Sequence, residues 1–208
     1  MAAAPSERPC GWKRTMGKRN YLIEGVSGTG KSSVCHELRR RGYAAINGDQ
    51  ELAYQGNPAT GEKTEGLRHE YHIWDVEKVR RLAADQADEA TFFCGGSRNF
   101  KRFIDLFDEV FILDVDARTL NERLDSRPDS WGKRKSERDL ILRLHATKED
   151  TPPGVVIDAT QPLTGVVDES SAVSEPNRRA RTASRRPAAP GGTRRAWRPA
   201  PCGRRREG

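Results

Sequence analysis

Short apolar runs alternate with longer amphipathic stretches along the middle of the chain. The apolar runs are rich in β-branched or aromatic residues, which favours strands over buried helix segments. Because they are apolar at nearly every position, they are typical of strands that helices cover on both faces of a sheet. The predicted strands are 21–25 (YLIEG), 43–47 (YAAIN), 91–95 (TFFCG), 110–115 (VFILDV) and 154–159 (GVVIDA).

The stretches between these runs predict helices, and capping residues mark several of their ends. Gly42 suits the end of the first helix, and Asp75 suits the start of the second. Ser136 and Asp139 have capping-box spacing at the start of the fourth. The segment 162–170 (PLTGVVDES) begins like a last helix and breaks off soon afterwards. The predicted helices are 32–41, 76–84, 117–126 and 137–147.

Strands that alternate with helices predict an α/β fold. We expect three layers, α/β/α, with a parallel sheet of five strands in the middle. In such sheets a ligand lies at the carboxyl ends of the strands, so the segments that follow the strands are where a site is expected.

The ends of the chain differ from its body in charge. The net charge of +7 divides into +4 over residues 1–20, −6 over 21–170 and +9 over 171–208. The overall positive charge therefore describes the ends. An acidic body argues against a nucleic-acid groove on the domain itself.

Composition sets the expected domain boundaries. Residues 170–208 are rich in Arg, Pro and Gly and have few aliphatic residues beyond Ala, so we expect a disordered tail. Two other interpretations stay open, an arginine-rich arm for RNA or DNA and the product of a shifted reading frame in GC-rich DNA. Residues 1–18 are expected to be a disordered leader with a natural start at Met16, which leaves a domain over 19–169.

Cysteine spacing and hydropathy indicate the cellular compartment in which the protein is expected. The four cysteines, Cys10, Cys35, Cys94 and Cys202, form no CxxC pair, and no signal peptide is evident. The longest strongly apolar run is far shorter than the roughly 20 residues that cross a bilayer. The sequence therefore predicts a cytoplasmic protein with free thiols, and it predicts Cys94 to be a buried strand residue.

A phosphate-binding loop lies between the first strand and the first helix. Residues 25–32 (GVSGTGKS) match GxxxxGK[ST], the P-loop pattern, whose backbone amides and helix N-terminus hold phosphates. Lys31 is expected to bridge the β- and γ-phosphates of ATP, and the Ser32 hydroxyl to ligate Mg²⁺. The predicted nucleotide-binding residues are Gly25, Val26, Ser27, Gly28, Thr29, Gly30, Lys31, Ser32 and Ser33.

Two segments look like GTPase motifs but have the wrong context. DSWG at 129–132 lies in a polar loop, and TKED at 147–150 follows it too closely for a βαβ unit between them. We interpret TKED as a frayed helix end before Pro152.

Four features, in order, point to a kinase group. They are the P-loop, INGDQEL after the second strand, CGGSRN after the third, and LDVDARTLNERLDSR with its LxxRLxxR spacing. With these, residues 19–169 resemble the nucleoside-monophosphate, shikimate and gluconate kinase group of P-loop kinases. The match departs from the group where Cys94 replaces an aspartate of adenylate-kinase-like relatives, and where Asn47 stands in place of the first aspartate of a DxD motif.

The resemblance implies roles for residues beyond the P-loop. Asp49 would be the carboxylate near the acceptor hydroxyl and, with Ser32, a metal ligand; a plain turn aspartate is the alternative. Arg127 first and then Arg123 would reach the γ-phosphate from a lid around 128–133; a solvated helix end is the alternative.

The resemblance also implies where the acceptor binds. Gly95, Gly96 and Arg98 would contact it, with Arg98 suited to an anionic group, unless the glycines only shape the turn. An acceptor-binding insert is expected at 54–75, where histidine and aromatic side chains either line a pocket or pack ordinarily. Those side chains are His69, Tyr71, His72 and Trp74.

The predicted function is an ATP- and Mg²⁺-dependent phosphotransferase that moves the γ-phosphoryl group to a small molecule. The acceptor classes are nucleosides, nucleotides and polyol or acid metabolites, rather than nucleic acid. The alternatives are a P-loop regulatory or nucleic-acid-binding protein that uses the basic tail, or a polynucleotide kinase.

Overall fold

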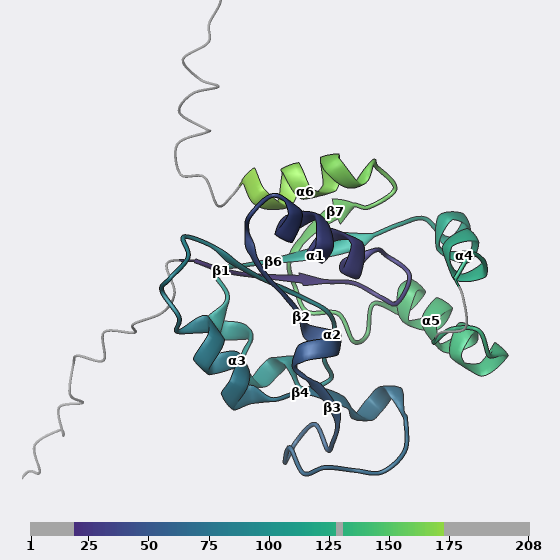
Figure 1. The fold of residues 1–208 in the computed structure, drawn as a ribbon. Coiled ribbons are helices and arrows are strands. Elements are labelled where there is room, and N and C mark those ends of the chain that lie inside the picture. Colours follow the sequence, from purple (N-terminus) through teal and green to yellow (C-terminus); the bar gives the residue numbers. More distant parts are fainter. Residues whose placement is uncertain (1–18, 128–130, 173–208) are drawn as a thin grey trace, which may run out of the picture. The chain divides into compact units, whose positions relative to one another are not determined.

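A parallel sheet of five strands, in the order β2, β5, β1, β6, β7, forms the centre of the protein (Figure 1). The computed structural model describes residues 19–127 and 131–172. Every neighbouring pair in this sheet is parallel, which confirms the predicted fold class. The strands are β1 (Asn20–Glu24), β2 (Ala44–Asn47), β5 (Thr91–Cys94), β6 (Glu109–Asp114) and β7 (Val155–Asp158).

Helices cover both faces of the sheet (Figure 1). One layer comprises α1 (Lys31–Arg40), α4 (Ala117–Asp125), α5 (Lys135–Thr147) and α6 (Leu163–Ala172). The other layer comprises α3 (Val76–Ala83) and the short turns η2 (Phe100–Arg102) and η3 (Ile104–Leu106).

The strand side chains alternate between two hydrophobic cores. Tyr21 and Ile23 of β1 pack with α1, α4, α5 and α6, whereas Leu22 packs with α3 on the opposite face. All three are at most 1% exposed. This two-sided burial is the reason that the strands are apolar at consecutive positions.

The predicted caps hold for two helices and not for a third. The Asp75 side chain accepts the Lys78 amide at 3.0 Å at the start of α3, and Gly42 follows the C-cap of α1. The fourth helix begins at Lys135, before the predicted start, and its capping carboxylate is Glu137 rather than Asp139. Glu137 reaches back over the first turn to the Gly132 amide at 3.0 Å, whereas Asp139 forms an ion pair with an exposed lysine.

Small elements that the sequence analysis did not predict follow β2. They are α2 (Gly48–Glu51), the antiparallel pair β3 (Ala53–Gln55) and β4 (His72–Trp74), and the turn η1 (His69–Tyr71). The expected acceptor-binding insert therefore has a hairpin-like base. Trp74 is fully buried and stacks on Phe103 at 5.6 Å between ring centroids, so it is a core residue.

The last helix is longer than expected. α6 continues through Ala172, the end of the described residues, instead of breaking off, because Val166, Val167 and Ser170 are buried against the rest of the domain. The chain divides into two units, Met1–Glu175 and Pro176–Gly208. The predicted leader, with Met16 and Cys10, lies outside the described residues, as do residues 128–130 of the predicted lid and the tail from 173 onward with Cys202.

A helix that crosses a bilayer has to be both long and apolar. Within residues 19–127 and 131–172, no helix is both long enough and apolar enough to cross one.

Candidate active site

The P-loop runs from β1 into α1 with backbone angles that favour glycine. Gly28 and Gly30 have φ of +105° and +107°, and Gly30 is the N-cap of α1 without a capping side chain. Ser32 and Ser33 are exposed in the first turn. The helix therefore presents uncapped amide groups and a serine hydroxyl to an anion.

Packing from α4 explains why the loop needs a glycine at position 28. A Cβ atom there would come within 2.6 Å of Leu120 Cδ1. The turn is closed internally by the Thr29 hydroxyl, which donates to the Val26 carbonyl at 2.9 Å. The helix and the turn together fix the loop.

The P-loop lysine contacts its own loop. Lys31 Nζ donates to the Gly25 carbonyl at 2.5 Å and to the Val26 carbonyl at 3.2 Å. Lys31 also lines a neighbouring cavity. A phosphate that binds to Lys31 therefore has these two contacts to replace.

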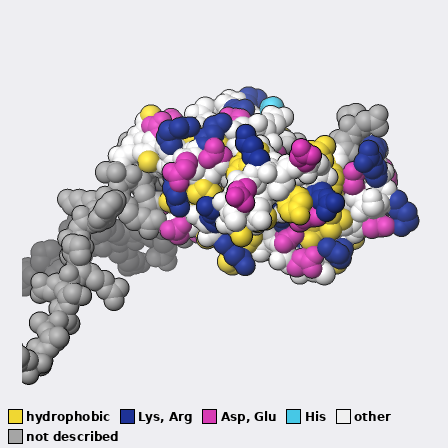
Figure 2. Space-filling view, turned by 90° about the horizontal axis from the view of Figure 1, so that it is seen from below, with side chains coloured by type: hydrophobic (Ala, Val, Ile, Leu, Met, Phe, Trp, Pro, Cys, Tyr) yellow, Lys and Arg dark blue, Asp and Glu magenta, His cyan; other side chains and the backbone are white. Residues whose placement is uncertain are grey.

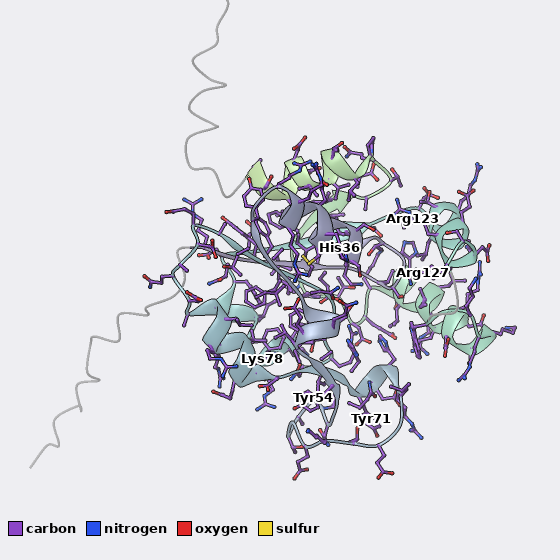
Figure 3. The ribbon with its side chains drawn as sticks, in the orientation of Figure 1. His36, Tyr54, Tyr71, Lys78, Arg123 and Arg127 are labelled. Carbon is purple, nitrogen blue, oxygen red and sulfur yellow. The ribbon has the colours of Figure 1, made fainter. Side chains whose placement is uncertain are left out.

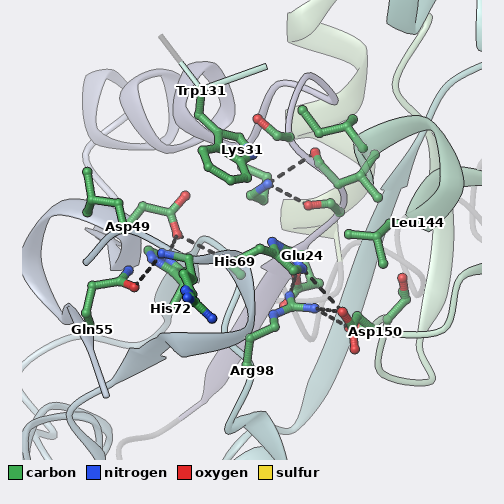
Figure 4. A pocket seen from close by; sticks show the side chains of 18 residues that line it. Glu24, Lys31, Asp49, Gln55, His69, His72, Arg98, Trp131, Leu144 and Asp150 are labelled. Atoms are coloured by element: carbon green, nitrogen blue, oxygen red, sulfur yellow. Dashed lines mark hydrogen bonds and ion pairs between the residues drawn. The ribbon is translucent and has the colours of Figure 1, made fainter. Parts of the chain in front are cut away.

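A cavity of about 390 Å³ opens beside the P-loop (Figure 4). Its walls come from the P-loop, from Asp49 of α2, from the insert, from the turn after β5 and from the segments around α5. The lining residues are Glu24, Gly25, Val26, Ser27, Lys31, Asp49, Gln55, Leu67, Arg68, His69, His72, Gly96, Arg98, Trp131, Ile141, Leu144, Asp150 and Thr151.

Many of the residues singled out from the sequence meet in this cavity. They include part of the P-loop with Lys31, then Asp49, Gly96 and Arg98, and both His69 and His72. Tyr71 and Trp74 are not among the lining residues, and neither are Ser32, Ser33, Gly95, Arg123 and Arg127.

Asp49 is held by donors on two sides. Its Oδ1 accepts the Gly96 amide at 3.1 Å and lies 3.3 Å from His72 Nε2. Burial would raise the pKa of Asp49, but the His72 hydrogen bond, the charge of Lys31 and the Gly96 amide outweigh it and keep the pKa below its usual value. Asp49 is therefore a fixed, ionised carboxylate opposite the P-loop.

Gly95 and Gly96 leave space that other side chains of the protein occupy. A Cβ at Gly95 would lie 2.7 Å from Trp74 and 2.8 Å from Asp49 Oδ1. A Cβ at Gly96 would lie 2.6 Å from Glu24 Oε1. Close approach at this turn thus brings two carboxylates to the cavity, and of the two glycines Gly96 is the one that lines it.

Arg98 belongs to a charged network on the far wall of the cavity. It is 11% exposed, and Nη1 contacts Asp150 Oδ2 at 2.8 Å, while His69 Nε2 lies 3.2 Å from the same oxygen. The Arg98 charge and the His69 hydrogen bond lower the pKa of Asp150 despite partial burial. Burial and the charge of Arg98 lower the pKa of His69, so this histidine is neutral near pH 7. Within residues 19–127 and 131–172, the buried Arg98 Nε has no hydrogen-bond partner.

Arg123 of α4 and Arg127, which lies just after this helix, contact the P-loop in different ways (both are labelled in Figure 3). Arg127 Nη1 donates to the Ser27 hydroxyl at 3.0 Å, and burial lowers the pKa of Arg127. Arg123 donates to the Thr29 and Ala159 carbonyls at 3.0 and 2.7 Å. Arg123 thus holds the loop through the carbonyl of Thr29, which does not line the cavity. Arg127 instead contacts the hydroxyl of Ser27, which does line it.

Sequence reasoning assigned no site role to several cavity residues, among them the carboxylates Glu24 and Asp150. Glu24 ends β1 and is 4% exposed; its only sequence signal is a charge within a strand that is otherwise apolar. Asp150 was read as part of a frayed helix end, and it follows the positive-φ cap Lys148 of α5. Trp131 lies within the predicted lid at 128–133, for which the sequence assigned roles only to arginines.

Within the described parts of the chain, no group of three or more His, Cys, Asp or Glu side chains could hold an ion by itself. Mg²⁺ carried by nucleotide phosphates needs fewer protein ligands. The exposed Ser32 hydroxyl at the start of α1 and the ionised Asp49 fit that requirement.

The chain is similar to several solved structures that are small-molecule kinases by name. A sugar kinase from Janibacter sp. HTCC2649 has 19% identity and a TM-score of 0.47, covering 74% of this chain and 92% of that one. A gluconokinase from Sinorhizobium meliloti 1021 has 20% identity and a TM-score of 0.47, covering 82% and 95%. Shikimate kinase from Bacteroides thetaiotaomicron has 15% identity and a TM-score of 0.45, covering 74% and 97%.

The search of curated proteins found no match. A family model described as an AAA domain matches residues 22–142, which is more than half of the chain and includes most of the sheet and the phosphate loop. The chain belongs to this AAA-domain family.

Proposed function

We propose that the protein is an ATP- and Mg²⁺-dependent kinase that transfers the γ-phosphoryl group to a small-molecule acceptor. The observation that carries the proposal is one cavity lined both by Lys31 of the P-loop and by the ionised Asp49. Phosphoryl transfer depends mainly on positioning and on neutralisation of charge, and these two groups supply both.

The P-loop would hold the nucleotide. Gly25 to Ser33 offer backbone amides at the start of α1, and Lys31 can leave the carbonyls of Gly25 and Val26 to contact the β- and γ-phosphates. Arg127 is within reach, because its present partner is a P-loop hydroxyl. Arg123 would act by positioning the loop.

The opposite wall would hold the acceptor. Asp49 would orient the acceptor hydroxyl, and Gly96 and Arg98 would contact the rest of the molecule. Apolar side chains of Ile141, Leu144 and Trp131 line the same cavity, so they would help to exclude water from the reacting phosphate. Mg²⁺, held by Ser32 and Asp49 with the phosphates, would neutralise charge on the transferred group.

Three substitutions test this proposal. Purified full-length protein is incubated with γ-³²P-labelled ATP, Mg²⁺ and a panel of nucleosides, nucleotides, sugars and sugar acids. We expect Lys31→Ala and Arg127→Ala to lower transfer by about 100-fold or more, because each removes a cation from the developing phosphate charge. Asp49→Asn should lower it to a similar extent.

Controls separate these effects from changes in fold. Lys101→Ala removes an exposed lysine of η2, far from the P-loop in sequence, and should keep wild-type transfer. If Asp49→Asn and Arg127→Ala both kept near-normal transfer, the site would be wrongly placed. If the wild-type protein labelled no acceptor in the panel, the kinase proposal itself would fail.

A further inference from the structure

Glu24 occupies an unusual place for a carboxylate. It is the last residue of β1, directly before the first P-loop glycine, and its side chain is 5% exposed where it lines the cavity. Each other residue of this strand is buried too. The chain therefore places an ionisable group at the boundary between the sheet and the reaction space.

Charged groups face Glu24 from three segments. Lys31 approaches from α1, Arg98 from the turn after β5, and Asp49 from α2. Gly96 has no side chain, and this lets Glu24 Oε1 approach the turn: an added Cβ would lie only 2.6 Å from that oxygen. Glu24 and Asp49 thus lie on two sides of Gly96 and border one cavity.

Packing and ion pairing do not explain why this residue is acidic. The Arg98 contact to Glu24 is 3.9 Å long, whereas Arg98 makes a close pair with Asp150 at 2.8 Å. Glu24 accepts a backbone hydrogen bond from Gly25, but burial of a carboxylate whose Arg98 contact is 3.9 Å long still costs free energy that an apolar residue would not cost. Groups that break the local pattern in this way are found preferentially at functional sites.

Given the proposed kinase function, we propose that Glu24 is a catalytic residue: the general base that accepts the proton of an alcohol hydroxyl on the acceptor. Asp49, whose Oδ1 is already occupied by the Gly96 amide and His72, orients the hydroxyl and the metal.

Transfer forms one bond to phosphorus and breaks another. The acceptor oxygen forms a bond to the γ-phosphorus, and the bond from that phosphorus to the β,γ-bridging oxygen breaks, with its electron pair leaving on ADP. The hydroxyl proton moves to a Glu24 oxygen and passes to solvent after the products leave.

This role narrows the class of acceptor. An alcohol holds its proton about as tightly as water does, so attack is assisted by a base. A phosphate acceptor has already lost most of its protons near pH 7, because its second pKa is about 6. A buried base therefore favours an alcohol acceptor over a nucleoside monophosphate.

The pKa shifts of Glu24 and Asp49 agree with Glu24 as the base and Asp49 as the orienting group. Burial raises the pKa of Glu24 to about 7, although Lys31 and Arg98 oppose the rise, and a base of that strength suits transfer near neutral pH. The pKa of Asp49 is lowered instead, which makes it the weaker base of the two.

The test compares Glu24→Gln, Glu24→Ala and Glu24→Asp in the full-length protein. Transfer from labelled ATP is measured on the same acceptor panel, and nucleotide affinity is measured separately with a fluorescent ATP analogue. We expect Glu24→Gln to lower kcat by about 100-fold or more while the nucleotide Kd changes less than about threefold. Added formate should restore part of the activity of Glu24→Ala, and Glu24→Asp should retain part of it.

A matched control and the outcomes separate this inference from the kinase proposal. Glu109→Gln changes a carboxylate at the opposite end of the sheet, where Glu109 pairs with Tyr21, and should leave kcat unchanged. Wild-type transfer with an equally active Glu24→Gln, or transfer only to phosphate acceptors, overturns the role of Glu24 and leaves the kinase proposal standing. No transfer by the wild-type protein overturns both.

Discussion

Glu24 links the stability of the protein to pH. Burial raises the pKa of this carboxyl from 4.5 to about 7, so the folded protein holds the proton more tightly than the unfolded chain does. Its contribution to stability is therefore present in full below about pH 4.5 and is lost as the pH rises through about 7.

Glu24→Gln removes this titration. Between about pH 5 and pH 8 we expect the free energy of unfolding of the variant to rise relative to wild type, by up to about 3 kcal/mol. Urea unfolding at several pH values measures the difference. Parallel curves for the two proteins across this range would contradict the assignment of a raised pKa.

The residues that could be found from the sequence are those with a motif or a place in the strand order. Lys31 is part of a pattern, and Asp49 and Arg98 follow predicted strands. Glu24 could not be found in this way, because its meaning depends on burial and on the approach of Arg98 and Gly96 from other segments. Asp150 likewise acquires its place only through Arg98 and His69.

The contact between α2 and β4 depends on one glycine. A Cβ at Gly48 would lie 2.0 Å from Trp74, a rigid ring that is fully buried. We expect Gly48→Ala to lower the free energy of unfolding by about 1–3 kcal/mol, since neither element can move freely. Gly165→Ala in α6 is the control: its Cβ would meet Gln161 only at 3.4 Å, and we expect a gain of about 0.5–1 kcal/mol. Denaturant unfolding measures whether the free energy of unfolding falls for Gly48→Ala and rises for Gly165→Ala.

The attachment of α6 to α1 depends on Arg41. Its guanidinium contacts Glu37 at 2.8 Å, Asp168 at 2.5 Å and the Thr164 carbonyl at 3.1 Å. Arg41→Ala should therefore speed amide hydrogen exchange in α6 while β1 stays protected. Arg40→Ala is the matched control, because Arg40 pairs with Glu37 inside α1. This variant should leave amide hydrogen exchange in α6 unchanged.

The larger elements were predictable because each strand is apolar at consecutive positions and each helix is long enough to show a period. β3 and β4 have only three residues each, too few for alternation to show. They form where Ile73 and Trp74 are fully buried, and Trp74 belongs to the core that includes α3 and Phe103, which is a tertiary cause. The extent of α6 was missed for the same reason, since its last turn contains buried serines rather than apolar residues.

Charge is distributed differently in the body and in the C-terminal segment. On the face shown in Figure 2, Lys and Arg side chains are interspersed with Asp and Glu side chains. Residues 171–208, in contrast, carry a net charge of +9. Removal of residues 173–208 keeps α6 whole and separates the two proposed classes of function.

If the protein is a kinase, the truncated chain should keep full transfer activity. If it is a tail-driven nucleic-acid binder, truncation should abolish binding to a labelled oligonucleotide together with its steep dependence on salt. Transfer assays and binding titrations at several salt concentrations measure both. Loss of transfer on truncation would show that the C-terminal segment takes part in the reaction.

The position of Lys31 has a consequence for which nucleotides the protein selects. The ammonium group of Lys31 already donates to the Gly25 and Val26 carbonyls, so a phosphate has to replace two hydrogen bonds within the loop. A lone phosphate offers little to draw the lysine away, whereas a chain of phosphates presents several anionic oxygens along the same path. Discrimination between ATP and ADP would thus begin when the nucleotide binds, before the acceptor binds.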